Sequence, residues 1–178
     1  MPALQVTTRP RDPKNAPIRK PSFDAPDFGV IARSESVQTS VFREGVHPRF
    51  LQANQLTEHI IGAAIEVHRH TGPGLLESIY EWALACELSL IGINVARQEL
   101  VRVEYKGFVR EEPLRFGLLA EGCVLVEAKS VTAIQPLHQA QVLSYMKLLD
   151  VPVGLLINFN ASRLAEGVHR LILPGANR

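Results

Sequence analysis

The sequence predicts an α/β protein, with helices on the faces of a mixed (α+β) sheet. Apolar residues recur at helical spacing over residues 54–91, and the period changes to two over residues 101–129. A further helical segment precedes residues 151–159, which are nearly all apolar, as is typical of a strand covered on both faces. Two helices, three strands, a helix and two strands, in this order, indicate a mixed sheet flanked by helices.

The composition is that of a globular protein, since 46% of the 178 residues are hydrophobic. No apolar run approaches the roughly 18 residues of a membrane span, so we expect no membrane association. The two cysteines, Cys86 and Cys123, lie in separate predicted elements without C-x-x-C spacing. This arrangement predicts reduced thiols and a cytoplasmic protein.

Residues 1–52 are expected to form a disordered, mildly basic extension, and residues 53–178 a folded domain. Seven of the twelve prolines lie in residues 1–50, which carry eight Lys/Arg and five Asp/Glu. Such a segment buries too little apolar area to offset its ordering entropy. Residues 51–178 carry eleven Lys/Arg and thirteen Asp/Glu. The domain therefore lacks the basic excess of a non-specific DNA binder, and nucleic-acid contact needs a local patch or the extension.

Two helices are expected first. Asn54 is a favourable N-cap residue, and Gly72-Pro73 ends the first helix. The second helix follows Gly74 and ends near Ile91. The predicted apolar faces are Leu56, Ile60, Ala64 and Val67 on the first helix, and Leu75, Ile79, Ala83, Cys86 and Leu90 on the second.

The remaining elements are mainly strands. A half-exposed strand over Val101–Tyr105 turns at Lys106-Gly107 into a second strand within Phe108–Leu119, where Pro113 marks a bulge or an edge position. A tight turn then leads to the third strand. The later predicted elements are the third strand Cys123–Lys129, a helix from Pro136 to about Leu149, a buried strand Val151–Phe159 and a last strand near His169–Leu173.

Glu127, Ala128 and Lys129 end the third predicted strand. Side chains alternate along a strand, so Glu127 and Lys129 project from one face. A carboxylate there can hold a divalent cation, while the lysine stabilises a bound hydroxide or a scissile phosphate. A strand-end ion pair at the surface is the alternative interpretation of the same residues.

Polar residues on two helices could join such a site. Glu77 can reach a metal at a sheet edge; it is equally the acidic residue that a helix dipole favours in the first turn. Gln141 and Tyr145 are i, i+4 on the third helix, so together they could orient a water, a metal ligand or a phosphate oxygen. The alternative is a polar helix edge with the Tyr145 ring in the core.

Other chemistries lack their motifs. The six histidines form no H-E-x-x-H or Cys/His cluster, which argues against a structural zinc site. No serine lies in a G-x-S-x-G motif. Gly72-Pro73-Gly74 does not follow a predicted strand, so it is a helix–helix turn and not a dinucleotide loop.

Three motifs together resemble the GxxExxY protein family, regarded as a branch of the PD-(D/E)XK nuclease superfamily. The resemblance covers about residues 53–174 and implies a restriction-endonuclease-like core of a helix, a β-meander, a second helix and a further strand. It also implies Mg²⁺- or Mn²⁺-dependent hydrolysis of phosphodiester bonds in DNA. The motifs are Gly74-x-x-Glu77-x-x-Tyr80, the strand ending Glu127-Ala128-Lys129, and Gln141-x-x-x-Tyr145.

The resemblance also implies roles for these residues. Glu127 and the Ala128 carbonyl would be metal ligands, and Glu77 would complete the metal shell. Lys129 would position the attacking water. The other matched positions are Gln141 and Tyr145, which correspond to the Q-x-x-x-Y element of exonuclease-like members, and the family-motif residues His68, Gly74 and Tyr80.

Gly117 departs from the family pattern, which has an aspartate ten residues before the glutamate of E-x-K. If Ala120-Glu121-Gly122 is a three-residue turn, Leu119 pairs with Cys123 and Gly117 with Leu125. Position 117 then lies on the same face as the E-x-K side chains, where an acid would share their cation. A glycine offers no ligand and weakens a strand interior, so packing does not explain it.

The missing acid predicts a weakened site. Magnesium is held by only one or two protein carboxylates, so Glu77 and Glu127 could still bind it, but more weakly. The acids nearest in sequence, Glu111, Glu112 and Glu121, do not clearly substitute for the aspartate. Losing one ligand and its geometry commonly costs orders of magnitude in rate.

Three functions stay open on the sequence. The first is a weak metal-dependent nuclease that acts through Glu77, Glu127 and Lys129. The second is an inactive nuclease-fold module that binds nucleic acid, in the first place DNA, or a protein partner. The third is a small interaction domain, in one version a homodimer, whose extension recruits a partner. A bound divalent cation separates the first function from the others.

Overall fold

The computed structural model describes residues 45–177, so the predicted disorder of residues 1–44 lies outside the described part. Within these residues the expected order of helices and strands is confirmed, with the short 3-10 helix η2 in addition. In chain order the elements are α1 (Phe50–Thr71), α2 (Glu77–Leu90), β1 (Val95–Tyr105), β2 (Phe108–Ala120), β3 (Val124–Lys129), α3 (Pro136–Leu149), β4 (Val153–Asn158), η2 (Leu164–Gly167) and β5 (Val168–Ile172).

The first helix begins earlier than predicted. Arg49 is the N-cap of α1, so residues 50–52 belong to the fold and Asn54 lies within the helix. The Arg49 guanidinium donates hydrogen bonds to the backbone carbonyls of Gly122 and Asp150. These distant contacts fix the start of the helix, which explains why capping propensity alone placed it too late.

The five strands form one mixed sheet in the order β1-β2-β3-β4-β5. Strands β3 and β4 are parallel, and the other neighbours are antiparallel. A parallel pair needs a crossover connection, which α3 provides. All six residues of β4 are buried, which confirms the prediction made from the apolar run of this strand.

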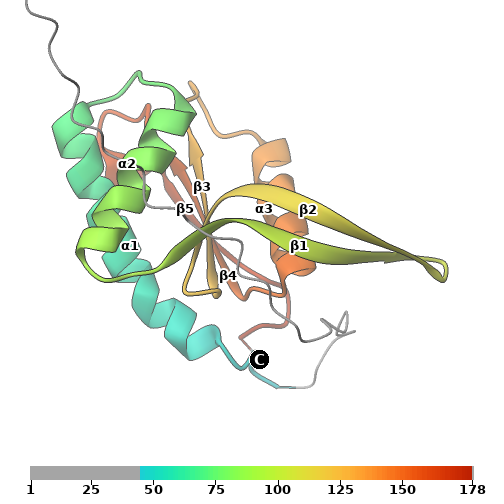
Figure 1. The fold of residues 1–178 in the computed structure, drawn as a ribbon. Coiled ribbons are helices and arrows are strands. Elements are labelled where there is room, and N and C mark those ends of the chain that lie inside the picture. The colour runs from blue at the N-terminus through green and yellow to red at the C-terminus, as the bar shows by residue number, and fades with distance from the viewer. Residues whose placement is uncertain (1–44, 178) are drawn as a thin grey trace, which may run out of the picture.

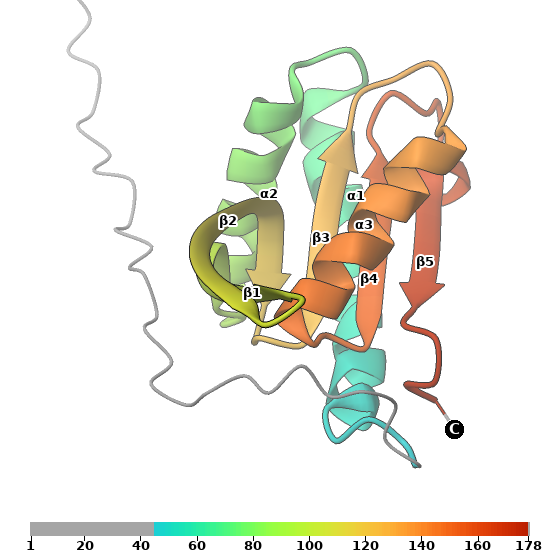
Figure 2. The ribbon, with the colours of Figure 1, turned by 90° about the vertical axis from the view of Figure 1, so that its right-hand side faces the viewer.

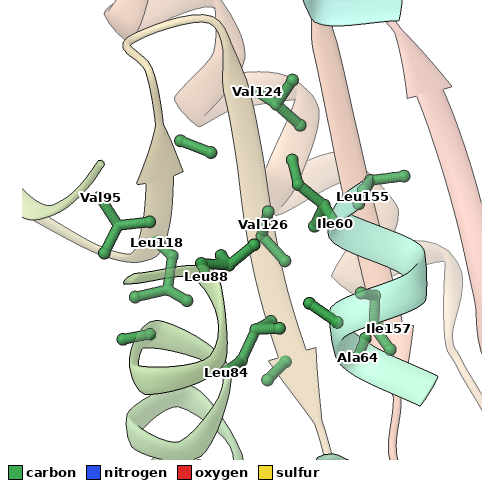
Figure 3. Packing of buried hydrophobic residues seen from close by; sticks show 14 of the residues in the cluster. Ile60, Ala64, Leu84, Leu88, Val95, Leu118, Val124, Val126, Leu155 and Ile157 are labelled. Atoms are coloured by element: carbon green, nitrogen blue, oxygen red, sulfur yellow. The ribbon is translucent and has the colours of Figure 1, made fainter. Parts of the chain in front are cut away.

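Helices α1 and α2 cover one face of the sheet, and α3 covers the other (Figures 1 and 2). Between them lie two apolar clusters. The cluster under α1 and α2 includes Ile60, Ala64, Leu84, Leu88, Val124, Val126, Leu155 and Ile157 (Figure 3). The cluster under α3 includes Leu125, Val142, Met146 and Leu156. Alternate residues of β3 and β4 thus serve opposite layers, as the period of a strand requires. Within residues 45–177, no helix has both the length and the apolar character needed to cross a membrane.

The predicted apolar face of α2 is wrong. Ile79 is 38% exposed and Leu90 80% exposed. Both flanks of this helix are apolar, so spacing alone did not show which flank turns inward. The buried residues are instead Tyr80, Leu84, Ala85 and Leu88.

Tyr80 explains which side of α2 faces the core. Its ring is fully buried and stacks on Phe159 at a centroid distance of 4.4 Å. Its hydroxyl donates to the Gly72 carbonyl at 2.7 Å and accepts from the Leu75 N–H at 3.0 Å. The tyrosine therefore ties the beginning of α2 to the end of α1.

We expect Tyr80→Phe to lower the free energy of unfolding by about 1–3 kcal/mol, because it leaves the two backbone groups without their partner. Urea unfolding of the full chain measures this loss. The matched control is Tyr105→Phe at the tip of the hairpin, where the residue is 68% exposed. The control should change stability by less than about 0.5 kcal/mol. Equal stability of the two variants would contradict the role given to the Tyr80 hydroxyl.

Strands β1 and β2 form a long hairpin that extends well beyond the rest of the sheet (Figure 1). The predicted turn at Lys106-Gly107 is confirmed. The regular pairing of β2 with β3 covers only residues 118–120, so in the described part of the chain most of the hairpin has no third strand beside it. Pro113 pairs regularly with Leu100 in this outer part, which confirms the edge alternative for the proline and not the bulge.

The irregularity of the hairpin lies at its base. Ala96 pairs with Leu119 but Gln98 pairs with Arg115, so three residues of β2 oppose one residue of β1. Such a bulge bends the strand and re-aims side chains. Residues 116–118 of β2, with Gly117 at their centre, make up the bulge.

Candidate functional site

The predicted strand-end residues meet where β3 ends and β2 turns away from it. Glu127 is 7% exposed, and its Oε1 accepts a hydrogen bond from Lys129 Nζ at 2.6 Å. The pair is therefore mostly buried, and the interpretation as an exposed surface ion pair is wrong. A buried ion pair is costly to desolvate, so it is weak evidence of a stabilising role and fits a functional one.

Gly117 lies beside Glu127, but in a different register from the one predicted. Leu119 pairs with Leu125, not with Cys123, and Leu118 pairs with Val126. The prediction took the turn one residue too early. The Gly117 N–H donates to Glu127 Oε2 at 3.2 Å. The backbone of β2 therefore holds the Glu127 carboxylate, although position 117 has no side chain that could bind a metal ion beside it.

Packing does explain the glycine, contrary to the prediction. A Cβ atom at position 117 would lie 2.3 Å from the Val126 carbonyl oxygen and 3.3 Å from Glu127 Oε2. The first distance is far inside van der Waals contact with a backbone atom. The bulge therefore brings β2 so close to β3 that no side chain fits at position 117.

Glu77 reaches the site from the first turn of α2. Its Oε1 accepts a hydrogen bond from the Ser130 N–H at 3.1 Å, just beyond β3. Its Oε2 lies 3.9 Å from Lys129 Nζ. The helix thus brings a second carboxylate to the lysine, so the predicted Glu77, Glu127 and Lys129 do lie together.

Glu81 is an acidic residue of the site that the sequence analysis did not select. It stands one helical turn after Glu77, and this i, i+4 spacing was the available signal. Burial raises the pKa of the Glu81 carboxyl above its ordinary value, and the negative charge of Glu127 raises it further. Arg97 opposes the shift. Glu81 is therefore a partly buried acid within electrostatic range of two other glutamates, and such perturbed acids cluster at functional sites.

Burial shifts the pKa values of Lys129 and Glu81 in opposite directions, whereas the negative charges of the glutamates raise both. Burial lowers the pKa of its ammonium, but the hydrogen bond with Glu127 and the charges of the surrounding glutamates outweigh this effect. The pKa of Lys129 is therefore raised, and the side chain stays cationic at neutral pH.

A pocket of about 400 Å³ opens next to these residues, between α2 and the base of the hairpin. It is lined by Glu81, Arg97, Gln98, Arg115, Phe116 and Gly117. No local motif marks Arg97 and Arg115 as neighbours. Arg97 lies in the part of β1 that precedes the predicted strand, and the bulge decides which residues of β1 and β2 face each other. Both arginines escaped the sequence analysis for this reason.

We expect Glu81→Gln to stabilise the protein at neutral pH. The pKa of Glu81 is raised in the folded state, so the folded chain binds more protons than the unfolded chain above the ordinary value of 4.5. Stability then falls as pH rises through this window, and the charged carboxylate costs stability above it. The glutamine variant removes that cost, and its advantage should disappear at pH values below 4.5.

Thermal unfolding over a pH series measures this effect. The control is Glu87→Gln on the same helix, outside the pocket lining. A Glu81→Gln variant that is less stable than the native chain at neutral pH would show that the carboxylate is a structural acceptor instead.

The family-motif residues support the site without entering it. Gly74 has φ +93°, a conformation that favours glycine, in the turn before α2. Tyr80 fixes the start of α2, as described above. His68 Nε2 lies 2.9 Å from the Ala161 carbonyl oxygen, within hydrogen-bond distance, and the imidazole stands beside the Phe159 ring.

Gln141 and Tyr145 lie on α3 and bond to each other, with the amide Nε2 at 3.2 Å from the phenol oxygen. The Tyr145 ring also packs against the apolar cluster under α3. In the described part of the chain, no hydrogen bond or ion pair joins either residue to Glu127 or Lys129. The alternative interpretation, a polar helix edge with the Tyr145 ring against the core, therefore describes this pair in the structure.

The oxygen-rich donor set suits a hard cation such as Mg²⁺. Within residues 45–177, however, no three His, Cys, Asp or Glu side chains are grouped closely enough to hold a metal ion. Glu127 is bonded to Lys129 and Glu77 to the Ser130 N–H. Because magnesium uses only one or two protein carboxylates, Glu77 and Glu127 are still a sufficient set of side chains.

The comparisons with known proteins agree with this geometry. A family model described as the PD-(D/E)XK nuclease superfamily matches residues 54–171, about two thirds of the chain. No curated protein and no solved structure matches. The matched stretch runs from α1 to β5 and includes every residue of the site. The chain therefore belongs to the PD-(D/E)XK nuclease superfamily.

Proposed function

We propose that this chain is a metal-dependent nuclease of the GxxExxY branch, which hydrolyses phosphodiester bonds in nucleic acid. The observation that carries the proposal is the buried Glu127–Lys129 pair at the end of β3, with Glu77 of α2 at 3.9 Å from the lysine. A carboxylate and an ammonium held together at a strand end in a nuclease-superfamily chain suit phosphoryl chemistry.

Glu127 and Glu77 would hold Mg²⁺ or Mn²⁺, with the Ala128 carbonyl as a backbone ligand. When bound, such an ion polarises a phosphoryl oxygen and lowers the pKa of a water molecule. Glu81 lies within electrostatic range of Glu127 and Glu77, so a bound cation would also offset its charge. Water would complete the coordination shell.

Lys129 would act on the attacking water or on the scissile phosphate. Its raised pKa keeps the ammonium charged, so it serves as a hydrogen-bond donor and a positive charge rather than as a base. Glu127 would keep the Lys129 side chain in place, since one of its carboxylate oxygens accepts from Lys129 Nζ while the other accepts from the Gly117 N–H.

A catalytically inactive module that binds nucleic acid or a protein partner is the second candidate. Gly117 favours it, because no acid fits at that position. The nuclease is the better supported of the two, since a chain that had lost catalysis has no evident need to keep Glu77, Glu127 and Lys129 together against their desolvation cost.

Cleavage assays test the proposal. The full chain is incubated with end-labelled single- and double-stranded DNA and RNA in Mg²⁺, in Mn²⁺ and in a chelator. We expect metal-dependent cleavage that falls at least about 100-fold in Glu127→Gln, because a metal ligand is lost. The control Glu58→Gln, an exposed acid on α1, should cleave like the native chain.

Binding of Mn²⁺, measured by titration calorimetry, gives a readout that does not depend on turnover. Glu127→Gln should bind the ion more weakly than Glu58→Gln. A native chain that neither cleaves any of the four substrates nor binds the ion would overturn the nuclease and leave the binding module.

A further inference from the structure

The pocket between α2 and the base of the β1–β2 hairpin is lined by more positive than negative side chains. Two of its lining residues are arginines, Arg97 and Arg115, and one is an acid, Glu81. The amide of Gln98 adds a neutral donor. At neutral pH the lining is thus net positive, in a domain whose residues 51–178 carry more acidic than basic side chains.

The geometry of the bulge creates this pocket. Gln98 and Arg115 are directly paired across the two strands, so their side chains leave the hairpin on one face. Arg97 is the residue opposite the bulged segment 116–118. Guanidinium groups match the oxygens of a phosphate in two-point hydrogen bonds, which makes a pair of them at a hollow a phosphate-binding arrangement.

The pocket adjoins the candidate cleavage site at Gly117. Gly117 lines it, and the Gly117 N–H is bonded to Glu127. A nucleic-acid strand whose scissile phosphate lies at Glu127 and Lys129 would have a neighbouring backbone unit on the side of Gly117, where the two arginines line the pocket. The volume of about 400 Å³ lies at the lower end of the range for small-ligand pockets, so it suits one nucleotide unit and not a duplex.

We infer that this pocket binds a backbone phosphate of the substrate strand, next to the phosphate that is cleaved. The inference rests on the proposed nuclease function and adds where the strand is held. It also supplies the local basic patch that nucleic-acid contact requires here, since the domain has no overall basic excess.

Binding of a fluorescent single-stranded oligonucleotide, measured by anisotropy in a chelator, tests the pocket without cleavage. Arg115→Ala should weaken binding about tenfold at low salt. The salt slope, which is the fall of the logarithm of the binding constant with the logarithm of the salt concentration, should decrease by about one, the value for one lost phosphate contact. Arg115 is exposed, so its replacement leaves the core intact. Gln98→Glu is the second variant, and the negative charge that it places in the pocket should also weaken binding.

The matched control is Arg110→Ala, on the same strand but outside the pocket. Arg110 forms an exposed ion pair with Glu112 and should contribute little to binding. Affinity and salt slope that are the same for Arg115→Ala and Arg110→Ala would overturn the inference. A mononucleotide that competes as well as the oligonucleotide would also overturn it, because the ligand would then be a free nucleotide and not a strand.

The two proposals fail in different ways. If the native chain neither cleaves nor binds Mn²⁺ but Arg115→Ala still loses affinity and salt dependence, the nuclease is wrong and the phosphate pocket stands. If the native chain cleaves and Arg115→Ala binds and cleaves like Arg110→Ala, the nuclease stands and the pocket assignment is wrong.

Discussion

Replacement of Lys129 by methionine is expected to reduce cleavage by at least about 100-fold, the usual effect of losing one electrostatic donor at a transition state. The same change should lower the free energy of unfolding by about 3 kcal/mol, because it leaves the Glu127 carboxylate, 7% exposed, without its cation. Single-turnover cleavage and urea unfolding measure the two effects separately. Lys147→Met, at an exposed position of α3, is the control and should change neither.

A double variant separates catalysis from stability at this site. Glu127→Gln combined with Lys129→Met removes both charges, so no unpaired buried charge remains and most of the lost stability should return. Cleavage should not return. A double variant that is as unstable as Lys129→Met would show that the pair holds β3 in place through its contacts and not through its charge balance.

Gly117→Asp is expected to destabilise the protein by about 3 kcal/mol and not to raise the rate of cleavage above that of the native chain. The Cβ atom would meet the Val126 carbonyl oxygen at 2.3 Å, so β2 must move away from β3. The new carboxylate would also stand next to Glu127, where a second negative charge is unfavourable. Urea unfolding measures the loss, and cleavage assays follow the activity.

Two controls make this result specific to position 117. Gly117→Ala should lose nearly as much stability, because the clash arises at Cβ. Gly62→Ala, on the exposed side of α1 with no atom near the added Cβ, should gain about 0.5–1 kcal/mol. A Gly117→Asp variant that is as stable as the native chain and cleaves faster would mean that the site lacks only a ligand and that the close approach of β2 is not needed.

Much of the fold follows from local patterns in the sequence. The apolar run of β4 and its complete burial agree because a strand covered on both faces needs apolar side chains at every position. Pro136 at the start of α3 and the alternation before Lys106-Gly107 identified a helix and a hairpin from the chemistry of a few neighbouring residues. The position of Glu127 and Lys129 at the end of a strand follows in the same way.

The errors concern features that depend on distant parts of the chain. The buried side of α2 was wrong because both of its flanks are apolar, and Tyr80 and Phe159 decide between them. The register of β2 against β3 was wrong because the turn begins one residue later, which no turn motif distinguished. Glu81 and Arg115 share a pocket only because of that register and of the bulge beside it.

The sequence by itself determined that this chain has helices around a mixed sheet and places a carboxylate and a lysine together at a strand end. These properties depend on periodicity and spacing, which are local. Only the tertiary structure decided that Gly117 is required by a close backbone contact, that the charges of Glu77 and Glu127 act on Glu81, and that two arginines line the adjoining pocket. The physical reason is that strand register and bulges are set by packing between segments far apart in the chain, and a shift of one residue changes which side chains meet.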